Sequence, residues 1–146
     1  KRLDAVRKFS EAGIPVAVMM APLIPALNDH EIERVLEAAA KAGAREAGYV
    51  MLRLPLEIKE LFREWLCEAY PDRAERILKL LRDMHGGADY MAAFGHRQRG
   101  AGPYAAQIAA RFRLARKRLG LDNERLGLRT DLFERPFGRG QQLGLF

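Results

Sequence analysis

Two strongly apolar segments restrict the folds that are open to this chain of 146 residues. The first covers residues 14–20, directly after Gly13, and the second covers residues 49–52, shortly after Gly43. Apolar runs without polar alternation are typical of strands that are buried on both faces, as in parallel sheets. The two glycines lie 30 residues apart, a suitable length for one strand and one helix. The repeat therefore predicts two adjacent parallel strands joined by a right-handed helical crossover.

The expected helices of this unit have recognisable ends. Residues 3–12 read as a helix closed by Gly13 in a left-handed cap. Asn28, with Glu31 three residues later, resembles a capping box at the start of the next helix. That helix should stop at Gly43, and its inward positions are Ile32, Val35, Leu36 and Ala39.

The unit is too small to form a parallel sheet by itself. A sheet buried on both faces needs more than two strands, and nothing after residue 56 supplies them. The helix at residues 3–12 also lacks the strand expected before it. We therefore expect an α/β fold in which residues 1–56 are the C-terminal part of a larger domain, a barrel or partial barrel. Residues 1–146 alone should be poorly stable.

Helical periodicity replaces the apolar runs after Pro55. Apolar stripes predict helices at residues 58–69, at residues 72–85 with Asp72 as the cap, and at residues 104–119. The inward positions of the last helix are Ile108, Phe112, Ala115 and Leu119. Residues 57–120 thus read as a helical extension, and residues 121–146 as an irregular basic tail.

Positive charge is concentrated in the last third of the chain. Residues 94–146 carry 11 Lys and Arg against 4 Asp and Glu, whereas residues 1–93 carry 14 against 15. A basic helix of this kind can lie along a nucleic-acid backbone, DNA or RNA. It can equally be a solvated face, or pair with the acidic helix at residues 57–68. The candidate phosphate contacts are Arg97, Arg99, Arg111, Arg113, Arg116, Lys117 and Arg118.

Several classes of site are excluded by the residues themselves. A single cysteine, Cys67, rules out an internal disulfide framework and a cysteine metal site, and we expect it to be partly buried on its helix. No histidine has a second ligand at a recognised metal spacing, and no nucleophile elbow or phosphate-binding glycine loop is present. The apolar stretch at residues 14–27 is shorter than the roughly 18 residues of a membrane span, and no secretory leader precedes it. These features favour a cytoplasmic protein with no metal or membrane site of its own.

Ligands of parallel α/β folds bind where strands end. The two predicted strand exits are residues 21–29 and residues 53–55. Asn28 and the helix N-terminus behind it offer hydrogen-bond donors, and Arg53 offers a cation. The alternative is that Asn28 only caps its helix and that Arg53 pairs with a nearby carboxylate.

Five short segments together carry a family resemblance. They are Ala-Pro-Leu-Ile-Pro-Ala-Leu-Asn-Asp at residues 21–29, Ala-Gly-Ala at 42–44, Arg-Leu-Pro at 53–55, Leu-Phe-Arg-Glu-Trp-Leu at 61–66 and Tyr-Pro-Asp-Arg-Ala at 70–74. This string resembles the C-terminal half of radical S-adenosylmethionine proteins, in the bacterial group related to spore photoproduct lyase and often labelled "DNA repair photolyase". The likeness covers most of residues 1–135.

The resemblance implies a partial (βα)6 barrel, of which this chain would hold the fifth and sixth strands. In the family, a Cys-x3-Cys-x2-Cys loop after the first strand binds a [4Fe–4S] cluster, and S-adenosylmethionine chelates its open iron. Reductive cleavage then gives a 5′-deoxyadenosyl radical. Cys67 cannot serve in that loop, so the parent protein would be the enzyme and this chain alone would be inactive. The residues that the resemblance places at the cofactor rim are Met20, Ala21, Pro22, Ile24, Asn28, Arg53 and Leu54.

The last five residues carry a second resemblance. Gln142, Leu143, Leu145 and Phe146 match the Gln-Leu-x-Leu-Phe peptide with which bacterial replication and repair proteins bind the DNA sliding clamp. The alternative is an apolar tail that tethers to the protein's own helices. Three hypotheses thus remain open. The first is the cofactor-facing rim of a radical enzyme, with nucleic acid as one candidate substrate. The second is a nucleic-acid-binding module, and the third is a helical interaction domain.

Overall fold

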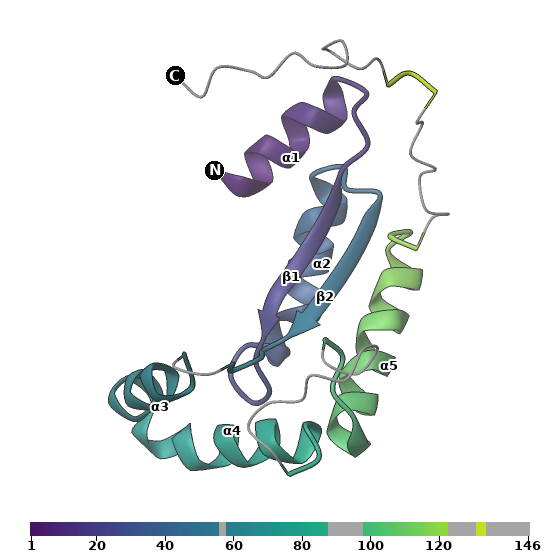
Figure 1. Ribbon diagram of the computed structural model, residues 1–146. Helices are drawn as coiled ribbons and strands as arrows, with labels where there is room; N and C mark the ends of the chain where they lie inside the picture. Colours follow the sequence, from purple (N-terminus) through teal and green to yellow (C-terminus); the bar gives the residue numbers. More distant parts are fainter. Residues whose placement is uncertain (56–57, 88–97, 123–130, 134–146) are drawn as a thin grey trace, which may run out of the picture.

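The computed structural model describes residues 1–55, 58–87, 98–122 and 131–133, and within them the fold is mixed α/β (Figure 1). Two parallel strands lie in front of one helix, and further helices surround the ends of the strands. The elements in chain order are α1 (Arg2–Glu11), β1 (Ala17–Leu23), the short 3-10 turn η1 (Asp29–Glu31), α2 (Ile32–Lys41), β2 (Glu46–Met51), α3 (Ile58–Ala69), α4 (Pro71–Met84) and α5 (Gly102–Arg118).

The predicted pair of parallel strands is confirmed, with shifted ends. Ala17 of β1 lies opposite Glu46 of β2, and Met20 lies opposite Tyr49. β1 begins three residues later than the apolar run, because the amide of Ile14 bonds to the carbonyl of Phe9 and closes α1 instead. The regular register is interrupted between Met20 and Leu23, where Pro22 has no amide hydrogen to donate.

Two glycines adopt the left-handed backbone that was predicted to end the helices. Gly13 follows α1 with φ 76°, and Gly43 follows α2 with φ 92°. Gly43 has a second role, because a Cβ added there would fall inside contact distance of the Ser10 hydroxyl and 2.7 Å from the Ser10 Cβ. The end of α1 therefore packs directly on the turn that follows α2.

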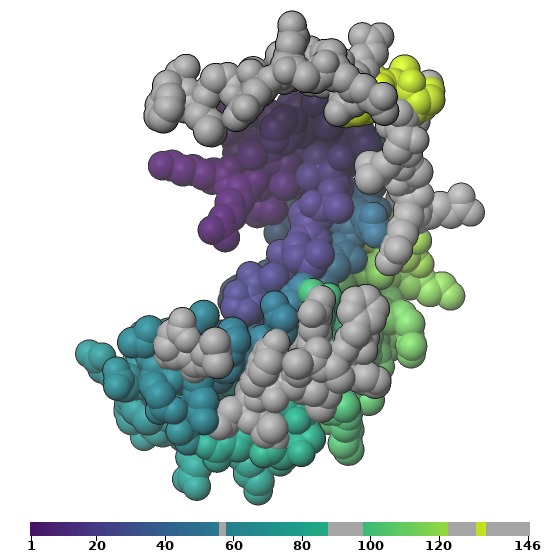
Figure 2. Space-filling view, viewed as in Figure 1, coloured from purple at the N-terminus to yellow at the C-terminus, as the bar shows by residue number. Residues whose placement is uncertain are grey.

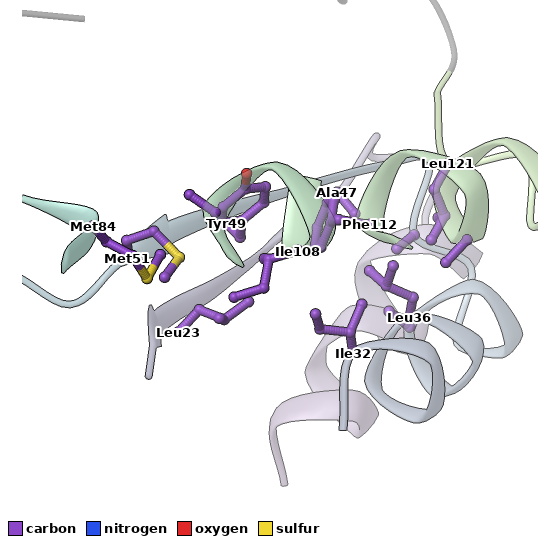
Figure 3. Close-up of a cluster of buried hydrophobic side chains, with 14 residues drawn as sticks. Leu23, Ile32, Leu36, Ala47, Tyr49, Met51, Met84, Ile108, Phe112 and Leu121 are labelled. Carbon is purple, nitrogen blue, oxygen red and sulfur yellow. The ribbon is translucent and has the colours of Figure 1, made fainter. Parts of the chain in front are cut away.

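The larger hydrophobic core lies between the sheet, α2 and α5 (Figure 3). Phe112 of α5 is 2% exposed, and its ring centroid lies 4.7 Å from that of Tyr49 on β2. Ile108 and Ala115 lie one turn to either side and are buried too, as the sequence predicted for this helix. Val35 of α2 was expected to face inward but is exposed.

A smaller core joins α3 and α4 to the ends of the strands. Its buried members are Ile24, Leu54, Leu66, Ala74, Ile77 and Leu81. The predicted cap of α4 is wrong, since Tyr70 occupies the cap and Pro71 the first turn, where a missing amide hydrogen costs nothing. The sequence predicts an inward apolar stripe on α3, which includes Ile58, Leu61 and Trp65, but these three side chains are exposed.

The two outer edges of the sheet differ. The outer edge of β2 is covered, because the Met51 amide donates to the carbonyl of Gln98 and the Ala47 amide donates to that of Leu121. β1 pairs with β2 alone among the described residues, and no backbone hydrogen bond from them reaches its other edge. Within the part of the chain that the structure describes, the sheet is therefore closed on the β2 side and open on the β1 side.

Candidate functional site

Both strands end beside each other, as a site at the carboxyl edge of the sheet requires. The Leu52 amide, just after β2, donates to the carbonyl of Leu23 at the end of β1, at 2.9 Å. The two exit segments therefore leave the sheet together and lead into the smaller core.

Asn28 is bound within its own loop and does not cap α2. Its side-chain oxygen accepts from the Ile24 amide at 2.7 Å, and its side-chain nitrogen donates to the Pro22 carbonyl at 3.0 Å. No side-chain hydrogen bond to the helix start is formed. The capping-box prediction is therefore wrong, and Asn28 instead holds the exit of β1 in a compact turn.

The other residues proposed for the cofactor rim separate into two groups. Ala21 and Pro22 are exposed, and Arg53 is half-buried without an ion pair or hydrogen bond to any described residue. Met20 packs against the larger core, and Ile24 and Leu54 are buried in the smaller one. Ile24 and Leu54 are thus closed to a ligand, whereas Ala21 and Pro22 are exposed and Arg53 is partly exposed.

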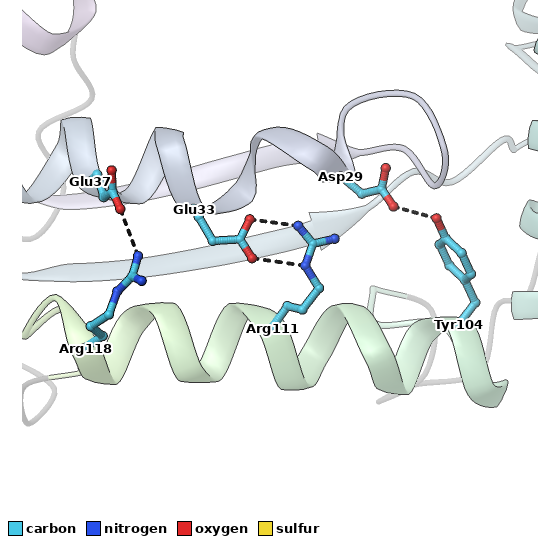
Figure 4. Close-up of polar contacts among 6 residues, drawn as sticks. All are labelled: Asp29, Glu33, Glu37, Tyr104, Arg111 and Arg118. Carbon is cyan, nitrogen blue, oxygen red and sulfur yellow. Dashed lines mark hydrogen bonds and ion pairs between the residues drawn. The ribbon is translucent and has the colours of Figure 1, made fainter.

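The basic helix α5 is in part a structural element. Arg111 donates two hydrogen bonds to the Glu33 carboxylate of α2, from Nε at 3.0 Å and from a terminal nitrogen at 2.7 Å (Figure 4). Arg118 likewise donates to Glu37 at 2.8 Å. The hydrogen bonds from Arg111 lower the pKa of Glu33, in spite of the partial burial that acts in the opposite direction. These two arginines clamp α5 to α2.

The remaining candidate phosphate contacts do not form one surface of free cations. Arg116 donates to the Leu121 carbonyl at 3.3 Å, and the Arg99 guanidinium lies 4.9 Å from the ring centroid of Tyr49. Arg113 and Lys117 are exposed and make no ion pair with the described residues. Arg97 lies outside the described residues, as do the proposed clamp-binding residues Gln142, Leu143, Leu145 and Phe146.

A cavity that the sequence analysis missed lies behind the exit of β1. Its volume is about 430 Å³, and it is lined by Ala26, Asp29, His30, Arg73, Arg76 and Tyr104. The Tyr104 hydroxyl donates to the Asp29 carboxylate at 2.6 Å, across 75 positions in sequence. Burial raises the pKa of Tyr104, and the hydrogen bond and the charge of Asp29 raise it further, so that Tyr104 stays a protonated donor. In the sequence, only the spacing of Arg73 and Arg76, one helical turn apart, pointed to this cavity. Nothing in the sequence predicted the contact between Tyr104 and Asp29.

Neither metal nor membrane sites are found in the described part of the chain. It holds no group of three or more His, Cys, Asp or Glu side chains that could bind a metal ion. Cys67 is exposed, contrary to the expectation of partial burial. None of the described helices is both long enough and apolar enough to cross a bilayer.

Comparison with known proteins finds relatives of unassigned role. Uncharacterized proteins of two Mycobacterium tuberculosis strains and of Mycobacterium bovis are each 31% identical to this chain over 83 residues. The match covers 56% of this chain and 24% of each relative, so the chain spans about a quarter of the length of the curated relatives it matches. No family model and no solved structure matches the chain.

Proposed function

We propose that this chain forms the last two strands of a barrel enzyme of the radical S-adenosylmethionine type, and that the ends of β1 and β2 line the rim of its site. The observation that carries the proposal is that no other described strand pairs with the outer edge of β1. A parallel strand with free backbone groups is a template for another strand. Because a right-handed crossover places successive strands side by side, the strand before α1 would pair with this edge.

The exposed face of the sheet supports the same arrangement. Along β1, Val18 and Met20 pack against the core beneath α2 and α5, whereas Met19 is 63% exposed and lies on the opposite face with Ala21. Figure 2 shows β1 uncovered between α1 and the pair α3–α4. In a βα barrel the helices cover the outer face of the strands and the inner face lines the site. The uncovered face would thus be the interior of the barrel.

Gly48 adds to this interpretation of the open face. It lies opposite Met19 in the register, and a Cβ at this position would come within 3.0 Å of the Met19 methyl group. A glycine on β2 therefore lets the Met19 side chain lie flat across the sheet. The inner surface of this part of the barrel would be apolar, which suits the flat rings of a nucleoside ligand.

The residues of this chain fit one part of the implied cofactor and not the other. The cluster has no ligands here, since Cys67 is the one cysteine in the sequence. The S-adenosylmethionine side is better matched, because Arg53 is a cation that makes no ion pair with the described residues. It follows Leu52, whose amide donates to Leu23 at the exit of β1. When bound to its cluster, S-adenosylmethionine supplies the radical that abstracts hydrogen from the substrate. The role of this chain would be to orient S-adenosylmethionine. Arg53 would bind its carboxylate, and the exit of β1 would cover an apolar face of the cofactor.

The proposal is tested on the complete protein, purified without oxygen. We expect an iron–sulfur absorbance, release of 5′-deoxyadenosine after reduction, and protection of the β1 amides from hydrogen exchange. Arg53→Gln should raise the S-adenosylmethionine concentration needed for half-maximal release, whereas Arg113→Gln removes the same charge from α5 and should not. A complete protein without a cluster and without cleavage of S-adenosylmethionine would refute the proposal.

A further inference from the structure

The cavity at the exit of β1 gathers three cationic or ionisable nitrogen side chains from two separate elements. Arg73 and Arg76 lie one turn apart on α4, and His30 lies on η1, directly before α2. The cavity volume of about 430 Å³ falls in the range of roughly 300–1,000 Å³ that is typical of small-molecule sites. The cavity is therefore large enough for a small ligand and not only for ordered water.

Arg73 and Arg76 are exposed on α4. Neither makes a hydrogen bond or ion pair with any described residue. Arg73 lies in the first turn of α4, where the helix dipole favours anions, and Arg76 lies one turn further along the helix. Arg111 and Arg118, by contrast, are paired with the carboxylates of α2. An anion bound in the cavity would give Arg73 and Arg76 a partner of opposite charge.

Asp29 and Tyr104 give the cavity a built wall. Asp29 is 7% exposed, and its carboxylate accepts the 2.6 Å hydrogen bond of the Tyr104 hydroxyl (Figure 4). This contact fixes the start of α5 against the loop that carries His30. The lining holds two guanidinium groups, those of Arg73 and Arg76, and one carboxylate, that of Asp29. Its charge is therefore positive on balance.

We propose that this cavity binds a phosphate group, held by Arg73 and Arg76 with His30 as a further donor. Guanidinium groups bind phosphate through paired, charge-assisted hydrogen bonds, and two of them one helical turn apart can contact one phosphate together. The phosphate belongs either to a nucleic-acid backbone or to a small molecule such as a nucleotide. The inference uses neither the cluster nor S-adenosylmethionine, and it goes beyond the proposed function.

Binding is measured on the complete protein with two probes, inorganic phosphate and a short single-stranded thymidine oligonucleotide. The variant Arg73→Gln/Arg76→Gln should lose roughly tenfold in affinity for phosphate, because each of the two exposed ionic contacts contributes less than about 1 kcal/mol. The control Arg2→Gln/Lys41→Gln removes the same charge from exposed positions of α1 and α2 and should bind as the unaltered protein does. Amide resonances of residues 26–30 should shift on titration.

Asp29→Asn separates binding from folding. The amide still accepts the Tyr104 hydroxyl but removes the negative charge, so we expect phosphate to bind about threefold tighter. A residue with a purely structural role would not raise affinity. A nucleic-acid backbone is the ligand if the protein binds the oligonucleotide more tightly than inorganic phosphate. In that case the salt dependence of oligonucleotide binding should fall by about two counterions in the double variant. Phosphate binding without oligonucleotide binding identifies a small ligand.

Two results would overturn the proposal. The first is that the unaltered protein binds neither probe. The second is that the double variant, with an unchanged circular dichroism spectrum, binds both probes as tightly as the unaltered protein does. Either result leaves the radical-enzyme proposal intact, because that proposal is tested by cluster absorbance and cleavage of S-adenosylmethionine.

Discussion

The bidentate contact between Arg111 and Glu33 allows a sharp test of what α5 does. As part of a nucleic-acid surface, Arg111 would be free for phosphate; as a clamp, it stabilises the fold. The two hydrogen bonds have good lengths, 3.0 and 2.7 Å, but the side chains are still 34% and 38% exposed. Exposed ion pairs contribute about 0.2–1 kcal/mol, and bidentate geometry puts this one near the upper limit. We expect a coupling energy of about 1 kcal/mol.

The assay is a double-mutant cycle of denaturant unfolding with Arg111→Gln, Glu33→Gln and the combined variant. A coupling of about 1 kcal/mol changes the folding equilibrium about fivefold. Arg113→Gln is the matched control, since Arg113 lies two positions away, is exposed and makes no ion pair with the described residues. It should change the free energy of unfolding by less than about 0.5 kcal/mol.

The coupling should also depend on pH in one direction. The hydrogen bonds from Arg111 lower the pKa of folded Glu33 below its ordinary value of 4.5, which the unfolded chain keeps. The contribution is therefore complete above that value and is lost as the pH falls through the lowered pKa of the folded state. A coupling energy near zero at pH 7, together with a loss of nucleic-acid affinity in Arg111→Gln, would refute the structural role of Arg111. It would favour a role of Arg111 in binding nucleic acid.

Three further outcomes follow from the packing. Gly43→Ala should destabilise the protein by about 2 kcal/mol or more in thermal unfolding, because alanine is strained in the left-handed backbone and clashes with Ser10. Adding Ser10→Gly should recover the part of this loss that is due to the clash. Phe112→Ala should cost about 3–5 kcal/mol by denaturant unfolding, because it empties a site between α5 and β2; a loss below about 1 kcal/mol would contradict this core. Arg113→Gln/Lys117→Gln should lower the salt dependence of nucleic-acid binding by about two counterions, and an unchanged slope would show that the exposed side of α5 is only solvated.

Local features of the fold were predictable from sequence because their causes are local. A glycine after each helix, an apolar run for each strand and the stripe of α5 each depend on neighbouring residues. The ends were less accurate: the first apolar run extends back to Ile14, but the closing turn of α1 takes that residue out of β1. The predicted capping role of Asn28 was wrong, because a side-chain amide that could cap a helix can equally bond back to its own loop.

Contacts between distant segments were not predictable from the same signals. Arg111 and Arg118 belong to a block of positive charge, and the block suggested nucleic acid. Their partners Glu33 and Glu37 lie about eighty positions earlier, on a different helix. The acidic side chains, four apart on α2, do form a stripe that could face a basic stripe, but many pairs of helices in one sequence offer such a match. The cavity of Arg73 and Arg76 escaped for the same reason, because its walls come from three segments.

The protected edge of β2 gives the sheet a direction of growth. Chain from either side of α5 binds this edge, through Gln98 before the helix and Leu121 after it, so the most C-terminal described strand is sealed by the segments that follow it. An edge bonded in this way offers few free backbone groups to a further strand. Any strand that is added to this sheet, from the same molecule or from a second one, is therefore expected at the edge of β1.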